Sequence, residues 1–242
     1  MGLGSYAWVS FGFLGAYSVE LRWAYTTRIA LLLFGVPWLV SMGKPIALAE
    51  AALTGRPLEL MHRFFASGFM RFIGNAVFEP LFTLAVFLVF LNPVSAVLRL
   101  NPISQDLTSV LIPLVGMLMV IPIMEDTRKH IGVFVTFEFM IAFAALVFDA
   151  IPGILLRLNG AVLDHLPSAA GNLPGWFPHA LRDQHLSGDF LWFLAEVADI
   201  PVLIILFVRW ARIDRSEAKK IDELSDEEME RLTQEHLHGR RP

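Results

Sequence analysis

Cysteine is absent from this chain of 242 residues, and charged residues make up only 17% of it. Without a thiol, the chain can form no disulfide framework, thiolate metal site, thiol-linked haem attachment or cysteine nucleophile. A soluble globular chain usually carries about 25% charged residues, and the charge here is concentrated after Trp210. The rest of the chain is therefore too apolar for an ordinary soluble domain.

Several signatures of other protein classes are also missing. The chain has no phosphate-binding glycine loop, no nucleophile elbow and no His-Glu-x-x-His zinc motif. Its net charge of -4 comes mainly from the acidic tail and does not favour nucleic-acid binding. The first residues lack the basic start and the small-residue cleavage site of a secretory signal. We therefore predict a non-enzymatic protein that binds no nucleic acid.

The sequence does contain long apolar runs. A helix needs about 20 mainly apolar residues to cross a bilayer. Runs that approach or reach this length occupy residues 6–19, 27–42, 73–91, 107–124, 131–151 and 190–208. They predict an all-α polytopic membrane bundle of about six transmembrane helices over residues 1–210, surrounded by the lipid bilayer. A charged tail over residues 211–242 follows the bundle.

The distribution of lysine and arginine predicts the orientation. Basic residues cluster in the stretches 44–71, 128–129 and 209–220, which fall on one side of a six-span bundle. Because cytoplasmic connections carry an excess of Lys and Arg, we expect both termini in the cytoplasm of a multi-pass plasma-membrane protein. A loop of about 35 residues between the last two spans is then extracytoplasmic. The opposite side holds fewer basic residues: Arg22, Arg28, Arg99, Arg157 and Arg182.

The tail has the pattern of a charged cytoplasmic helix. Acidic and basic residues are mixed from 212 to 238, and apolar residues recur among them at spacings of about three to five. Such a helix either docks on a partner or stays solvated as a stop-transfer segment.

Two acidic residues mark the last predicted span. Glu196 and Asp199 are three residues apart, so both project from one face of a helix, and Pro201 frees a carbonyl nearby. An acid at the centre of the hydrocarbon costs about 2.5–3.5 kcal/mol on insertion scales and therefore usually has a partner. The pair predicts either a polar pocket for a cation or a proton, or hydrogen bonds that hold neighbouring helices together.

Three more acids lie in other predicted spans. Glu79 and Glu138 each lie about two turns from the cytoplasmic face, which favours a structural role for both. Asp149 lies near the outer surface and is a candidate ligand. Together with Glu196 and Asp199, these acids form a predicted intramembrane polar site.

The predicted outer loop holds three of the seven histidines, with aspartates close by in the sequence. Imidazole and carboxylate together can bind copper or zinc. We take His179 and His185 as candidate metal ligands, with Asp183 as a third donor. Their spacing matches no compact ligand motif, and the alternative is that these histidines bind no metal.

The end of the chain carries the most distinctive motif. An Asp-Gln-x-x-x-Gly sequence enters the last span, a glutamate follows, and a Trp-x-Arg-x-Asp-x-x-Glu-Ala sequence begins the tail. The motif residues are Asp183, Gln184, Gly188, Glu196, Trp210 and Asp214. A second stretch, from Pro37 to Pro45, reads Pro-Trp-Leu-Val-Ser-Met-Gly-Lys-Pro. Both stretches resemble the CtaG-type cytochrome c oxidase assembly factors of the caa-type oxidase group.

This resemblance implies a membrane protein that helps to load copper into the oxidase, with membrane histidines as ligands. It also implies seven spans with an outer amino terminus, so the six predicted spans would be those left if the first were missing. Where the family has a histidine pair one helical turn apart, this chain has Tyr25 and Ile29, and no predicted span contains a histidine. The family's copper ligands therefore do not carry over, and the cofactor stays unknown.

Three functional hypotheses follow. The first is a divergent, non-enzymatic assembly or maturation factor for cytochrome c oxidase in the respiratory chain, with oxidase subunits as partners and copper delivery as an open extension. The second is a cation or proton transporter or channel lined by the intramembrane acids. The third is a structural subunit of a larger membrane complex.

Overall fold

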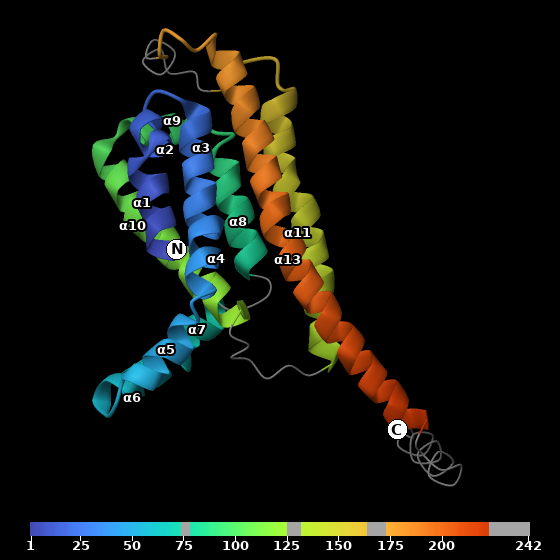
Figure 1. The fold of residues 1–242 in the computed structure, drawn as a ribbon. Helices are drawn as coiled ribbons and strands as arrows, with labels where there is room; N and C mark the ends of the chain where they lie inside the picture. Colours follow the sequence, from blue (N-terminus) through green and yellow to red (C-terminus); the bar gives the residue numbers. More distant parts are fainter. Residues whose placement is uncertain (74–77, 125–131, 164–172, 223–242) are drawn as a thin grey trace.

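The computed structural model describes residues 1–73, 78–124, 132–163 and 173–222 (Figure 1). Every regular element in these residues is a helix, which confirms the all-α prediction. Four helices there are long and apolar enough to cross a membrane: Arg22–Ser41, Pro102–Ile121, Phe139–Leu158 and Ala180–Arg215. The bent pair Pro80–Val89 and Val94–Leu100 makes a fifth if its two parts, inclined at 80°, form one broken span. The membrane-helix character of the chain is thus confirmed.

The expected first span has a different form. It divides into α1 (Gly2–Phe11) and α2 (Phe13–Tyr17), and the backbone of Gly12 between them is extended. Neither piece reaches the length that a span needs. Both nevertheless pack along the next helix (Figure 1). Six spans therefore stays a prediction.

The centre of the bundle is one nearly continuous helix made of α3 (Arg22–Ala30), the π-helical turn η1 (Leu31–Gly35) and α4 (Val36–Ser41). Pro37 has no N–H to donate to the preceding turn. The turn before it is wider, because the Val36 N–H donates to the Leu31 carbonyl five residues back. The helix therefore continues past the proline.

Neighbouring helices bury this central helix. α1 and α10 (Pro102–Met124) pack on its η1–α4 part, and α13 (Ala180–Asp222) packs on α3 (Figure 1). Gly116 of α10 lies so close that a Cβ there would stand 2.1 Å from the Leu33 carbonyl oxygen. The main core cluster consists of Tyr25, Ile29, Ala30, Leu33, Phe34, Phe87, Phe90, Leu156, Leu191, Ala195 and Ala198.

A long pair of helices forms the second part of the bundle. α11 (Gly132–Leu158) and α13 lie side by side, and α8 (Phe78–Val89) packs on α11 (Figure 1). Both long helices contain a proline, Pro152 and Pro201, and continue through it. In a membrane bundle neighbouring helices can satisfy the freed carbonyls. α11 continues to Leu158 and α13 begins at Ala180, so both ends of the predicted loop are helical, and His185 lies in a helix rather than in a loop.

The two ends of the bundle differ. α5 (Pro45–Ala52), α6 (Arg56–Phe65) and α7 (Gly68–Ile73) project at the end where α13 finishes (Figure 1). α9 (Val94–Leu100) and the beginning of α13 lie at the opposite end. α13 has 43 residues, about 64 Å of helix, so it extends past the bundle. It runs without a break through Trp210, and the division of the chain at 210 stays a prediction; residues 223–242 lie outside the described part.

Candidate functional site

Asp183 of α13 caps the beginning of α3 from across the bundle. Its Oδ2 accepts a hydrogen bond from the Arg22 backbone N–H at 2.7 Å, and its Oδ1 accepts one from the Trp23 N–H at 2.9 Å. The first N–H groups of a helix have no partner within the helix, and Leu21, the local N-cap residue, offers no side-chain acceptor. The Asp183 side chain is 4% exposed. Its negative charge also interacts favourably with the positive, amino-terminal end of the α3 helix dipole. This contact fixes α13 to α3.

Gln184 joins three segments at the same place. Its Oε1 accepts from Arg22 Nη1 at 3.0 Å and from the Leu163 N–H at 2.7 Å. Its Nε2 donates to the Ala161 carbonyl at 2.9 Å and approaches the carbonyls of Leu156 and Asn159. The side chain is fully buried. The Gln184 amide therefore links α13 by hydrogen bonds to Arg22, to the end of α11 and to residues 159–163.

The next turn of α13 continues the contact. Ser187 Oγ lies 2.8 Å from Thr26 Oγ1 of α3, and both side chains are fully buried. Gly188 meets α11, since a Cβ added there would lie 2.5 Å from the Gly153 carbonyl oxygen and 2.8 Å from Arg157 N. Small residues allow membrane helices to approach this closely. Asp183, Gln184 and Gly188 of the predicted motif thus act together on two neighbouring helices.

A second set of polar contacts surrounds Arg28, which is 6% exposed. Its Nη1 donates to Gln105 Oε1 at 2.6 Å and to Ser18 Oγ at 3.3 Å, and its Nη2 donates to Ser109 Oγ at 2.6 Å. Gln105 Nε2 donates in turn to the Arg99 carbonyl at 2.8 Å. Arg22 and Arg99 both interact electrostatically with Asp183. We call Arg22, Arg28, Arg99, Gln105, Asp183 and Gln184 the polar network.

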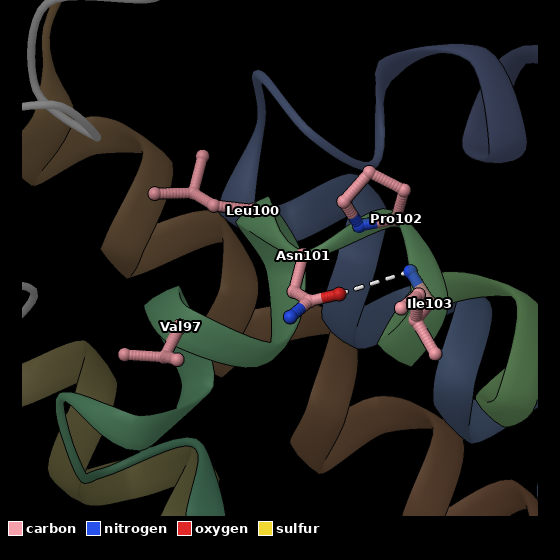
Figure 2. A pocket seen from close by; sticks show the side chains of 5 residues that line it. All are labelled: Val97, Leu100, Asn101, Pro102 and Ile103. Carbon is pink, nitrogen blue, oxygen red and sulfur yellow. Dashed lines mark hydrogen bonds between the residues drawn. The ribbon is translucent and has the colours of Figure 1, made fainter.

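A hollow of about 550 Å³ lies on the surface beside the polar network. Figure 2 shows its lining, Val97, Leu100, Asn101, Pro102 and Ile103. Asn101 Oδ1 accepts from the backbone N–H of Ile103 at 2.9 Å and so caps α10. The hollow is wide open and mainly apolar, and its one polar side chain serves the helix end.

The predicted intramembrane acids occupy different environments. Glu196 is half-buried and its Oε1 accepts from Trp192 Nε1 at 3.1 Å, one turn back on α13. Asp199 is half-buried, and Asp149 of α11 is 2% exposed. The side chains of Glu79 and Glu138 lie outside the described part. A shared ion or proton site among these acids stays a prediction.

The two candidate metal-ligand histidines each contact the backbone. His179 precedes α13, and its Nδ1 accepts from the Arg182 N–H at 3.0 Å, as a helix cap does. His185 Nε2 lies 3.2 Å from the Asn159 carbonyl oxygen. Asp183 uses both of its oxygens on α3. Within the described ranges no three His, Cys, Asp or Glu side chains are grouped to hold a metal, and copper at these histidines stays a prediction.

The remaining motif positions lie along the far part of α13. Trp210 is half-buried, and its ring lies 5.8 Å from that of Phe207; Asp214 is exposed. Tyr25 and Ile29, at the positions of the family's histidine pair, are each 3% exposed and belong to the core cluster. The Tyr25 ring packs edge-on against Phe90. Both side chains therefore serve the hydrophobic packing of the bundle.

Sequence reasoning missed the arginines of the polar network. The sequence predicts outer connections for Arg22, Arg28 and Arg99, yet all three lie in helices and are at most 6% exposed. Long charged side chains in an apolar segment are expected to face the bundle interior. Arg28, followed by a continuous apolar run from Ile29 to Val36, carried that signal in the sequence.

Comparison with known proteins identifies the family. The model of the cytochrome c oxidase caa3 assembly factor family matches residues 1–213. Two uncharacterized proteins, one of Mycobacterium bovis and one of Mycobacterium tuberculosis, are each 36% identical over 84 residues. That stretch is 35% of this chain but only 13% of each relative, so this chain spans a small part of their length. No solved structure matches. The chain belongs to the cytochrome c oxidase caa3 assembly factor family.

Proposed function

We propose that this protein supports the assembly of a cytochrome c oxidase as a non-enzymatic membrane factor. The observation that carries the proposal is the family match over residues 1–213, which includes the whole helical bundle. Oxidase subunits would be its partners. We propose the plasma membrane as its location, with the last part of α13 and the tail in the cytoplasm.

The geometry supports a role through contacts rather than catalysis. The motif residues of α13 are used to hold helices together, as the bonds of Asp183 and Gln184 illustrate. By contrast, the outward face of α13 presents large apolar side chains, among them Phe193, Val197 and Ile204 at 62%, 50% and 57% exposure. Such a face suits lipid or another membrane helix.

Deletion of the gene tests the proposal. We expect the deletion strain to lose cytochrome c oxidase activity and the haem–copper absorption of its membranes, and the wild-type gene to restore both. Loss of the oxidase is expected because its subunits would lack a partner during maturation. An oxidase of normal activity and spectrum in the deletion strain would contradict the assembly role and favour the transport or structural-subunit hypothesis.

Copper delivery is a separate part of the proposal. The family's histidine pair is replaced by Tyr25 and Ile29, and His179 and His185 both contact the backbone. If copper is handled at this end, those two imidazoles must turn toward it. Copper content of the purified wild-type protein, compared with a His179→Ala, His185→Ala double variant, distinguishes the two cases.

A further inference from the structure

α6 lies outside the helical bundle. None of its ten residues is buried, and it projects with α5 from the end of the central helix (Figure 1). Its large side chains Leu60 and Phe64 are 65% and 45% exposed. Fully exposing an aliphatic or aromatic side chain of this size to water costs about 1.5–3 kcal/mol relative to burial. Another phase or another molecule must therefore cover this helix.

The residues of α6 divide cleanly into two faces. A helix turns by about 100° per residue, and at that spacing the apolar and the polar residues fall on opposite sides. The apolar face consists of Pro57, Leu58, Leu60, Met61, Phe64 and Phe65. The polar face consists of Arg56, Glu59, His62 and Arg63. A short helix with a wide apolar face and arginines beside it is the pattern of a helix that lies in the membrane interface.

The position of α6 along the chain brings it to the membrane surface. Three residues separate the end of the candidate span Arg22–Ser41 from the beginning of α5 at Pro45. On the other side, α7 leads toward the bent pair of helices that starts at Pro80. Each of α5 and α6 is at most about 15 Å long. A segment this short, joined to a candidate span before it and to the bent pair after it, stays at the level of one lipid headgroup layer.

Charge supports lipid as the covering phase. Arg56 and Arg63 lie about 20° apart around the helix, beside the apolar face, where they can reach lipid phosphates. His62 Nε2 lies 3.1 Å from Glu50 Oε1 of α5 on the polar face, and both side chains are about half exposed. This contact directs the polar face of α6 toward α5 and water and leaves the apolar face toward the bilayer.

We propose that α6 lies flat in the headgroup region of the bilayer, with Leu60 and Phe64 in the acyl chains and Arg63 at the phosphates. The polar face, including Glu59, is in water. The helix thereby anchors this end of the bundle at a fixed depth. The anchoring does not depend on any role in oxidase assembly.

Site-directed spin labelling of the full chain tests this proposal. The chain has no cysteine, so the single variants Leu60→Cys, Phe64→Cys, Glu59→Cys and Arg63→Cys each give one labelled site. All four positions are exposed outside the bundle, so the fold should tolerate them. The labelled proteins are reconstituted in phosphatidylcholine–phosphatidylglycerol vesicles. Accessibility to oxygen, which concentrates in the acyl chains, is compared with accessibility to a water-soluble nickel chelate.

We expect oxygen to relax the labels at 60 and 64 more than the nickel chelate does, and the reverse at 59 and 63. Glu59 and Arg63 serve as matched controls on the same helix. Four sites that all favour the nickel chelate would overturn the proposal, since the helix would then lie in water. Four sites that all exclude both reagents would also overturn it, since protein would then cover α6.

Discussion

Replacing Asp183 with alanine is expected to lower the unfolding temperature of the detergent-purified protein by roughly 5–15 °C. The two backbone N–H groups of Arg22 and Trp23 would lose their acceptors inside the bundle. Each buried donor left without an acceptor costs about 1–3 kcal/mol. The substitution also removes the negative charge that interacts with Arg22 and Arg99, two buried cations. Thermal unfolding followed by circular dichroism measures the effect.

Asp189→Ala is the matched control for this substitution. Asp189 lies on the same helix six residues on, and its Oδ1 pairs with Arg157 Nε at 3.0 Å. Both side chains are about 40% exposed, and exposed ion pairs contribute about 0–1 kcal/mol. Asp183→Asn should fall between the two, because it keeps one acceptor oxygen but loses the charge. Equal unfolding temperatures for the Asp183→Ala and Asp189→Ala variants would contradict the capping role.

Replacing Gly188 with leucine is expected to separate α13 from α11. Even a Cβ at this position would lie 2.5 Å from the Gly153 carbonyl oxygen and 3.0 Å from Leu156 Cβ. Because the first of these atoms is backbone, the helices must move apart rather than a side chain rotate. Overpacking of this kind typically costs about 1–3 kcal/mol for a few methylenes. We expect a lower yield of folded protein and an unfolding temperature below that of the wild type.

Comparing the Gly188→Ala and Gly4→Ala variants distinguishes the effect of packing on stability from the effect of helix propensity. Alanine favours a helix over glycine by about 1 kcal/mol. At Gly4 in α1 an added Cβ would meet no atom within 4 Å beyond its own stretch of helix, so Gly4→Ala should be neutral or stabilising. Gly188→Ala gains the same propensity but adds the clash with Gly153 and should be destabilising. A stabilising Gly188→Ala variant would show that the two helices do not approach each other as described.

The sequence indicated the residues of the α3–α13 contact but not what they do. Asp183, Gln184 and Gly188 were identified through a family resemblance, since a polar motif stands out in an apolar chain. Their action could not be predicted, because the partner of Asp183 lies about 160 residues away along the chain. A helix cap supplied from another helix leaves no local pattern.

The predictions for the arginines and for the helix ends differ from the structure for a related reason. Arg22 and Arg28 looked like residues of an outer connection because charge usually ends a span. In the structure Gln105 and Gln184 on other helices accept from them, so both arginines lie inside the bundle, Arg22 at the first position of α3 and Arg28 within it. The predicted fifth span likewise ends at residue 151, whereas α11 continues through Pro152 to Leu158. The helix α6 was not predicted in the basic stretch 44–71, and its two faces became apparent only once the structure gave its bounds.

Most of these expectations depend on the contact between the beginning of α13 and the beginning of α3. Thr26 and Ser187 are its most direct probe, since their hydroxyl oxygens lie 2.8 Å apart on the two helices and the chain has no other thiol to interfere. The Thr26→Cys, Ser187→Cys double variant should form a disulfide in native membranes on mild oxidation. After denaturation neither cysteine should then react with a maleimide until a reductant is added. Leu60→Cys paired with Ser187→Cys should stay fully reactive, and full reactivity of the Thr26–Ser187 pair as well would contradict the contact.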